Sequence, residues 1–353
     1  MPINALNEDG TAVDWWFMYK VAGKAKTGQG GKVSGSEYLY FDSTSPSGAK
    51  FSLSPRRIDK DGALLNTLEQ LYNEAVVNPD LGWFFYNDEN PIDNTVNSDR
   101  GHTKGALAFD LQSDTAFWLI HSTPKFSAKG KYIYPITGMP NAQTLLCISL
   151  KNADTAKAIA NQMFAAQQPN VYLASAVPIS LTNAPNDPRV KLINNQVAVG
   201  NTPVQTTLPF YSQANLKFIA IAKNKHWGLD FYNDLVGPVL KQNLEVETWE
   251  HDPTPAGNDS DGIHKVLATA DVNLQALGID ISWPEADDHA KLAISDHLES
   301  PHFVCVGDLN FTIAQRKRGG GTVAFQCEDL WKSLSEILQP VPVAATQSPV
   351  AEV

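Results

Sequence analysis

Two short segments of the sequence carry the same pattern and lie about half a chain apart. Each is a histidine followed, after one intervening residue, by a lysine: His102-Thr103-Lys104 and His289-Ala290-Lys291, in a chain of 353 residues. One such triplet is a weak signal, because charged and polar residues are common on protein surfaces. Two copies half a chain apart are more specific, and they predict a chain built from two related halves.

The residues after each triplet extend the repeat. Ser122 lies eighteen positions after Lys104 and Asp308 lies seventeen positions after Lys291, each behind an aromatic and apolar segment typical of a buried strand. We read this as a degenerate two-fold repeat and expect two halves, residues 1–150 and 151–338. A Pro- and Ala-rich tail at 339–353 should be disordered.

Strand-like and helix-like segments alternate through both halves, which predicts the α/β class. Short apolar or alternating runs predict strands at 13–19, 38–42, 50–54, 83–88, 144–150, 215–223 and 244–251. Apolar residues at helical spacing predict helices at 61–76, 152–166, 229–242 and 328–338, the second capped by Asn152 or Asp154. The segment 252–262 is expected to be a loop.

Composition limits the kind of partner. With 43% hydrophobic and 18% charged residues the chain can bury a large core, and a net charge of −11 disfavours a general nucleic-acid coat. A polyanion would need a local basic groove. The sequence contains neither an apolar run of ~18 residues nor an amphipathic membrane helix, so we expect no membrane partner. The start lacks the layout of a signal peptide, which leaves the compartment open between cytoplasm and export with a removed signal.

The three cysteines are Cys147, Cys305 and Cys327, and none is in a CxxC or zinc-ligand spacing. Cys305 and Cys327 are close enough in sequence to form a short disulfide loop. Three buried thiols are an equally good interpretation. Neither reading implies a metal site.

The two triplets suit phosphate chemistry. Residues i and i+2 of an extended segment point to the same face, so both triplets can address one phosphate from opposite sides. A neutral histidine can attack phosphorus to form a phosphohistidine, while a protonated one donates to the leaving oxygen and then activates water. The lysines, helped by Ser122 and Asn310, would hold the remaining oxygens, so we expect no metal and no cofactor. A coupled histidine pair predicts a bell-shaped pH profile on the acid side of neutral.

In combination, several segments resemble the deoxyribonuclease II family of the phospholipase D superfamily. They are VDWWFMYK (13–20), YLYFD (38–42), GALLNTLEQLY (62–72), GHTKGALAFD (101–110), FWLIHSTPKF (117–126), AQTLLC (142–147), DHAKLAIS (288–295), VCVGDLNF (304–311) and QRKRGGGTVAFQC (315–327). The resemblance implies a phospholipase D-like fold, in which two pseudo-symmetric, mixed-sheet α/β halves form one clamp-shaped unit. DNA is then expected to lie across a groove between the halves. The resemblance also implies metal-independent hydrolysis of duplex DNA at acidic pH, leaving 3′-phosphate and 5′-hydroxyl ends.

Residue by residue, the resemblance carries over to the four triplet positions, His102, Lys104, His289 and Lys291. By analogy with the superfamily, His102 is expected to be the nucleophile and His289 the general acid. Cys305 and Cys327 match a cysteine pair of the family, whereas the partner expected for Cys147 near the N-terminus is absent. Asp296 has the superfamily spacing after the second triplet, but it falls in a longer segment at 295–303, and we give it no role.

Further residues are weaker site candidates. His121 either orients the site or is structural, and Ser122, Asp308 and Asn310 are expected to line it. Basic residues expected to contact the DNA backbone are Arg316, Lys317 and Arg318 before a glycine run, then Lys223, Lys225, His226 and the lysines of loop 23–36. Gly101 and Gly105 are expected to leave space for a DNA strand.

Two other functions stay open. One is a phospholipase D-type phosphodiesterase acting on RNA or lipid. The other is a catalytically silent DNA-binding clamp, against which the intact histidines and lysines of both copies argue. A homodimer is a possible assembly.

Overall fold

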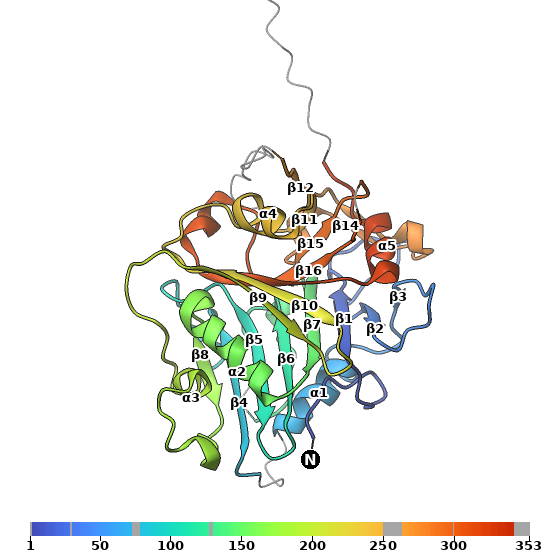
Figure 1. Ribbon diagram of the computed structural model, residues 1–353. Helices are drawn as coiled ribbons and strands as arrows, with labels where there is room; N and C mark the ends of the chain where they lie inside the picture. The colour runs from blue at the N-terminus through green and yellow to red at the C-terminus, as the bar shows by residue number, and fades with distance from the viewer. Residues whose placement is uncertain are drawn as a thin grey trace, which may run out of the picture.

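A computed structural model of the protein describes residues 2–28, 30–72, 78–126, 130–249, 263–298 and 300–341. Two large sheets organise the chain. The first is eight-stranded, in the order β3-β2-β1-β7-β6-β5-β4-β8. Its strands are β1 (Trp15–Lys20), β2 (Tyr38–Asp42), β3 (Ser52–Leu53), β4 (Leu81–Asn87), β5 (Lys104–Asp110), β6 (Thr115–His121), β7 (Gln143–Leu150) and β8 (Val171–Ala174). In Figure 1 this blue-to-green sheet lies below the yellow-to-red one.

The second sheet is seven-stranded, in the order β12-β11-β15-β16-β17-β10-β9. Its strands are β9 (Gln205–Tyr211), β10 (Lys217–Lys223), β11 (Leu244–Thr248), β12 (Val266–Ala268), β15 (Lys291–Ser295), β16 (Val304–Gly307) and β17 (Gly320–Phe325). A small two-stranded sheet joins β13 (Val272–Asn273) to β14 (Ser282–Trp283).

The centres of the two large sheets repeat one another. Five antiparallel strands run β4-β5-β6-β7-β1 in the first sheet and β11-β15-β16-β17-β10 in the second. The edges differ, because β8 pairs with β4 antiparallel whereas β12 pairs with β11 parallel. The predicted α/β fold is confirmed. The first sheet takes β8 from beyond residue 150, so its strands do not all come from the N-terminal part of the chain.

Alternating apolar residues explain how the sheets pack. Along β6, Trp118 and Ile120 point into the core between the two sheets, while Phe117 and Leu119 point to the outer face of the first sheet. A strand with both faces apolar must be covered on both sides, because successive side chains point to opposite faces. The central core is continuous between the sheets and holds side chains from both, including Val304 and Val306 of β16.

Helices cover the remaining apolar faces. Helix α1 (Ala63–Tyr72) packs on the outer face of the first sheet, and α2 (Ala153–Gln162) and α5 (Glu328–Ile337) contribute to the central core. Asn152 caps α2, as predicted, because its side chain accepts a hydrogen bond from the Thr155 amide. A π-helical turn at Met163–Gln167 extends α2. Short helix α3 spans Pro188–Ile193.

The helix predicted at 229–242 is shorter than expected. It consists of a π-helical turn, Tyr232–Val236, followed by α4 (Gly237–Leu240). These turns cover the outer face of the second sheet. The strand predicted at 244–251 ends at Thr248, and the loop predicted at 252–262 and most of the tail at 339–353 lie outside the described residues. No helix in the described ranges combines the length and apolar character needed to cross a membrane.

The possible Cys305–Cys327 disulfide is wrong in this structure, in which all three cysteines are free. Cys305 of β16 points to the outer face of the second sheet, while Cys327 packs against the central core on the other face. The sheet itself lies between them. The alternation of side chains along a strand therefore separates two cysteines that are near in sequence.

Candidate active site

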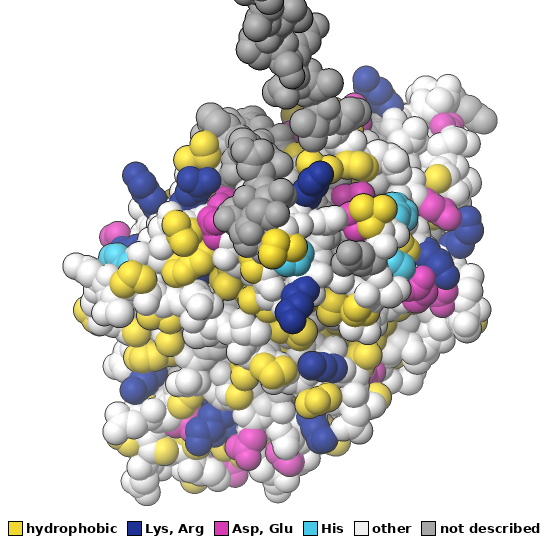
Figure 2. Space-filling view, turned by 45° about the horizontal axis from the view of Figure 1, so that its top comes forward, with side chains coloured by type: hydrophobic (Ala, Val, Ile, Leu, Met, Phe, Trp, Pro, Cys, Tyr) yellow, Lys and Arg dark blue, Asp and Glu magenta, His cyan; other side chains and the backbone are white. Residues whose placement is uncertain are grey.

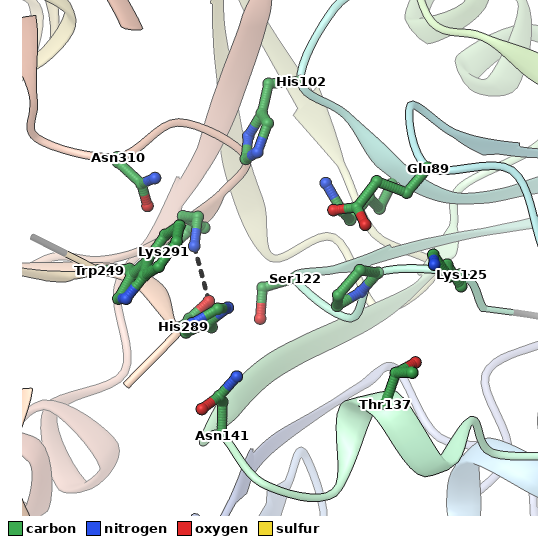
Figure 3. Close-up of a pocket in the computed structure, with 12 residues that line it drawn as sticks. Glu89, His102, Ser122, Lys125, Thr137, Asn141, Trp249, His289, Lys291 and Asn310 are labelled. Carbon is green, nitrogen blue, oxygen red and sulfur yellow. Dashed lines mark hydrogen bonds between the residues drawn. The ribbon is translucent and has the colours of Figure 1, made fainter. Parts of the chain in front are cut away.

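The two His-x-Lys triplets enter one hollow between the sheets. Each lysine is the first residue of a central strand, Lys104 of β5 and Lys291 of β15, and each histidine lies two residues earlier. Figure 3 shows the two histidines facing the hollow from different segments, with Ser122 beside them. The lining residues are Glu89, His102, Lys104, Ser122, Pro124, Lys125, Thr137, Asn141, Trp249, His289, Lys291 and Asn310.

Each triplet is anchored on the opposite half. The amide of His102 donates to the carbonyl of Gly319 at 2.8 Å, and the amide of His289 donates to the carbonyl of Ala142 at 3.0 Å. Gly319 directly precedes β17, and Ala142 directly precedes the equivalent strand β7. The pseudo-symmetry therefore extends from strand order down to single hydrogen bonds.

Asp308 stabilises the backbone at the first triplet through hydrogen bonds. Its carboxylate accepts the amides of Lys104 at 3.4 Å and Gly321 at 3.3 Å. Burial raises the pKa of Asp308 to about 8, against the opposing attraction of Lys104 and the two amides. Asp308 is therefore neutral in acid, and it does not line the hollow among the residues described there.

Ser122, which follows the first triplet as Asp308 follows the second, makes hydrogen bonds that stabilise the second triplet. Its Oγ accepts the amide of Thr144 at 3.0 Å and donates to Gln143 at 2.5 Å. The hydroxyl of Thr144 in turn accepts the amide of Lys291 at 3.2 Å. Ser122 lines the hollow while also holding the second triplet in place.

One hydrogen bond decides which nitrogen of His102 can react. Nδ1 lies 2.6 Å from the backbone carbonyl oxygen of Asp308. A carbonyl oxygen only accepts, so Nδ1 carries the proton and Nε2 of the neutral ring keeps its lone pair. Burial, and then the neighbouring Lys104, lower the pKa of His102 to about 3. The ring therefore stays neutral in moderately acidic solution.

His289 has different surroundings. Its ring lies 4.3 Å, centroid to centroid, from the indole of Trp249, with an angle of 33° between the planes. The two histidines are thus in unlike environments.

The two lysines also differ. Lys104 Nζ lies 2.5 Å from Asp88 Oδ1, and Arg318 lies 2.8 Å from the other carboxylate oxygen. Burial would raise the pKa of Asp88, but Lys104, His102 and Arg318 outweigh it and hold that pKa well below its usual range. Lys291 Nζ donates instead to the carbonyl of His289 at 2.7 Å.

Two physical effects lower the pKa of Lys291 to about 7. The first is burial, and the second is repulsion from Lys104. Asp288, Asp88 and Asp308 attract the ammonium but do not offset these effects. Lys291 therefore carries a full charge only on the acid side of neutral.

The remaining predicted residues lie at different depths. Asn310 lines the hollow, and within the described part of the chain its Oδ1 has no hydrogen-bond partner. His121 lies behind the lining, with its ring edge-on to Phe126, and burial lowers its pKa to about 3. Arg316 lies at the limit of an ion pair, 3.9 Å from Asp230. Arg318 points inward to Asp88.

Two sequence expectations need correction. Lys223 is fully buried and donates to the carbonyls of Gln315, Arg316 and Arg318, so it cannot contact a DNA backbone. The glycines beside His102 leave room for protein instead of DNA. A Cβ on Gly101 would lie 2.0 Å from the carbonyl oxygen of Gln167, and one on Gly105 would lie 2.2 Å from that of Leu119.

Several residues at or beside the hollow were not found from the sequence. They are Asp88, Glu89, Pro124, Lys125, Thr137, Asn141 and Trp249. Asp88 and Trp249 each follow directly after a strand, β4 and β11, that pairs with the strand carrying a site lysine. A search for chemistry-bearing residues at equivalent strand ends would have found both. Lys125 lines the hollow with a left-handed backbone, at φ 55°.

Among the residues that the structure describes, no three His, Cys, Asp or Glu side chains are grouped so that they could hold a metal ion. The face in Figure 2 shows basic, acidic and apolar side chains interspersed, with no large field of one charge. The positive charge of the site is local and largely internal.

Similarity to known proteins extends over almost the whole chain. The profile of the deoxyribonuclease II family matches residues 4–342. A putative deoxyribonuclease-2 of Burkholderia pseudomallei (strain K96243) is 40% identical over 350 residues, covering 97% of this chain and 94% of the relative. Deoxyribonuclease-2 of Caenorhabditis elegans is 30% identical (94% and 91% covered), and deoxyribonuclease-2-alpha of Rattus norvegicus is 30% identical (96% and 95% covered).

Proposed function

Because the chain belongs to the deoxyribonuclease II family of nuclease-type hydrolases, we propose that it is an acid endonuclease that needs no metal. Its substrate is double-stranded DNA, cleaved with little sequence preference to 3′-phosphate and 5′-hydroxyl ends. The observation that carries the proposal is the convergence of two histidines and two lysines, one pair from each half, on a single hollow.

In the first step His102 is the nucleophile. The lone pair of Nε2 attacks phosphorus, a P–N bond forms and the P–O5′ bond breaks. The imidazolium of His289 gives its proton to the leaving O5′, which becomes the 5′-hydroxyl. The orientation of Nδ1 toward the Asp308 carbonyl supports this role, because it leaves Nε2 as the reactive nitrogen.

In the second step water completes the hydrolysis. His289, now neutral, takes a proton from water, and the resulting hydroxide attacks phosphorus. The P–N bond breaks, which releases the 3′-phosphate and restores neutral His102 and protonated His289. Each histidine ends the cycle in its starting form, so no other acid, base or oxidant enters the balance.

The charges around the hollow suit a phosphodiester. Lys104, Lys291 and Arg318 are cationic in acid, Asp88 is the single ionised carboxylate bonded to two of them, and Asp308 is neutral below its raised pKa of about 8. An excess of positive charge at a partly buried site stabilises the additional negative charge of a phosphoryl-transfer transition state.

Acidic conditions allow one neutral and one protonated histidine to coexist. The pKa of His102, lowered to about 3, leaves it unprotonated at about pH 5. His289, whose ring lies 4.3 Å from the Trp249 indole, is proposed to be the protonated partner. The two rings need opposite protonation states, and their unlike surroundings supply the difference.

Low sequence preference follows from what the site offers. Ammonium groups, imidazoles and the Asn310 amide in the hollow match phosphate oxygens, which are the same at every step of the duplex. Lys317 is exposed, Arg316 is partly exposed, and both remain candidates for flanking phosphates. The predicted homodimer stays a prediction.

The proposal is tested by nicking of supercoiled plasmid in EDTA at about pH 5 and about pH 8. We expect nicking in acid, and losses of roughly 10³-fold or more in His102→Ala and His289→Ala. His302→Ala, which removes a ring stacked on Trp331 away from the hollow, is the matched control and should retain activity. Absence of acid nicking by the wild type, or full activity in both site variants, would overturn the proposal.

Two further measurements refine the outcome. End-labelling of the products reports whether the phosphate stays on the 3′ side. A rapid quench into alkali, followed by a denaturing gel, should trap labelled DNA on the wild type and not on His102→Ala. Binding of DNA without cleavage would favour the silent clamp, and faster cleavage of RNA would favour the other phosphodiesterase.

A further inference from the structure

The pseudo-symmetry identifies one position at which the two halves of the site differ in kind. Asn87 of β4 pairs with Lys104, and Thr248 of β11 pairs with Lys291. The next residue along the chain is therefore structurally equivalent in the two halves. It is Asp88 in the first half and Trp249 in the second.

We propose that Asp88 is a positioning residue that keeps the Lys104 ammonium charged and aimed at the hollow, so that the two site lysines have separate roles. Lys104 is then held by a carboxylate, whereas Lys291 is held by two backbone carbonyls. The inference rests on the proposed nuclease function and adds a division of labour between its two lysines.

The contacts of Asp88 support this role. The Asp88 side chain is 2% exposed and the Lys104 side chain 5% exposed, with 2.5 Å between carboxylate and ammonium. In a site shielded from water, an opposite charge at hydrogen-bond distance strongly favours the charged form of each partner. The direction of Nζ is set by the same contact.

Asp88 also connects the two halves. Its second carboxylate oxygen accepts from Arg318, which lies two residues before β17 of the second sheet. The backbone carbonyl of Asp88 accepts the amide of Asn97, which ties the residue to the β4–β5 connection. Contacts at both carboxylate oxygens and at the backbone therefore fix the orientation of Asp88 toward Lys104.

The equivalent place in the second half offers no carboxylate to Lys291. Trp249 stacks on His289 instead, and the Lys291 ammonium donates to the carbonyls of His289 and Ala290. Carbonyl dipoles stabilise an ammonium less than a full negative charge does. At this position Trp249 therefore contacts the His289 ring, but it provides no carboxylate for the Lys291 ammonium.

Other charged groups face Lys104, and Asp88 is the ionised carboxylate among those that the structure describes. Lys291 repels the Lys104 ammonium when it is charged, and Asp308 is neutral in acid. The groups that interact electrostatically with Lys104 are Asp88, His102, His121, Lys291 and Asp308, and Arg318 shares its carboxylate. Without Asp88, the Lys104 ammonium and the Arg318 guanidinium would lose the carboxylate that both contact.

The experiment measures kcat/KM against pH for the wild type, Asp88→Asn and a control, Asp99→Asn. Asp99 is a carboxylate 3.4 Å from Lys225 on the exposed surface, and its loss should leave the profile unchanged. In Asp88→Asn we expect the alkaline limb to move toward acid by about 1 pH unit or more, since both lysines then lose charge together. Asp88→Glu should restore the position of the limb but not the full kcat, because the longer side chain misplaces Nζ.

A double-mutant cycle tests whether Asp88 acts through Lys104. If it does, Asp88→Asn should cost roughly 10²-fold in kcat/KM alone and much less in a Lys104→Gln background. Equal losses in both backgrounds would overturn the inference. Circular dichroism at each pH verifies that the variants are folded.

A measurement on the wild type covers the case in which Asp88→Asn does not fold. With lysines labelled at ¹³Cε and ¹⁵Nζ and assigned through Lys104→Arg and Lys291→Arg, the Lys104 ammonium should outlast that of Lys291 as pH rises. The reverse order would overturn the inference even if the protein cleaves DNA. A wild type that does not cleave DNA would instead remove the proposed function on which the inference rests.

Discussion

At the scale of single residues, the two triplets have the same sequence pattern but different chemistry. His102 presents a lone pair on Nε2 because Nδ1 donates to a carbonyl, whereas His289 stacks on an indole. Lys104 is paired with a carboxylate, and Lys291 with two carbonyls. The proposed phosphoryl transfer needs one nucleophilic and one acidic histidine, and the different surroundings of the two rings suit these two roles.

A pH profile should report these environments. The acid limb of kcat/KM belongs to protonation of His102, whose pKa is lowered to about 3, so activity should persist well below the usual histidine range. Loss of charge on Lys291, whose pKa is lowered to about 7, should contribute to the alkaline limb. Initial rates on a fluorescent duplex from about pH 3 to about pH 9 measure both limbs.

Lys291→Arg isolates the second effect, because guanidinium stays charged over the whole range. The alkaline limb should move to higher pH even if kcat falls. Lys332→Arg, at an exposed position of α5 away from the hollow, is the matched control. If the alkaline limb does not move in Lys291→Arg, a group other than Lys291 determines that limb.

Asp308 should make the folded state more stable in acid. Its pKa is raised to about 8 in the folded protein and is near 4 when unfolded. The folded state therefore keeps a proton that the unfolded chain loses, and stability falls as pH rises from about 4 to about 8. In Asp308→Asn the free energy of unfolding should depend less on pH. At pH 8 the loss of stability relative to acid should be smaller by roughly 2 kcal/mol or more. An equally steep dependence in the variant would contradict the shift.

At the scale of elements, the site depends on how closely the segment before β5 packs. Gly101 lies against the π-helical turn that follows α2, and the amide of His102 reaches Gly319 before β17. Three segments distant in sequence meet here with no side chain between their backbones. Glycine is required because a Cβ would displace backbone, which cannot move as a flexible side chain can.

Gly101→Ala should therefore destabilise the protein by about 1–3 kcal/mol or more and displace His102. Gly237→Ala is the control, since a Cβ there would meet its neighbours at ordinary contact distances of 3.4 Å and beyond, within a helix. Urea unfolding and kcat/KM measure the two effects. Equal stability of both variants would contradict the close approach.

At the scale of the whole molecule, two sheets share one core, and the site is formed where strands of both sheets begin. The continuous central core holds the halves together without a covalent link between the described cysteines. Burial of apolar surface at this scale is sufficient for a stable domain.

The free thiols give a direct test. Thiol titration in denaturant without reductant should find three per chain, and reductant should leave the thermal midpoint unchanged. Mass spectrometry after alkylation without reduction is an independent check. A chain with one thiol, or a midpoint lowered by several degrees in reductant, would show that the disulfide forms.

The sequence by itself determined the α/β class, most strands, the capped second helix and the paired triplets. Alternation, helical spacing and motif duplication are properties of the linear sequence, so they can be recognised without the fold. The sequence also identified the two histidines and two lysines that the fold brings to one hollow, because the duplicated pattern is specific. Only the tertiary structure decided that Asp88 holds Lys104, that Trp249 stacks on His289, that Lys223 is buried and that the sheet separates Cys305 from Cys327. These facts depend on strand pairing and on the direction of side chains across a sheet, which residues far apart in sequence establish together.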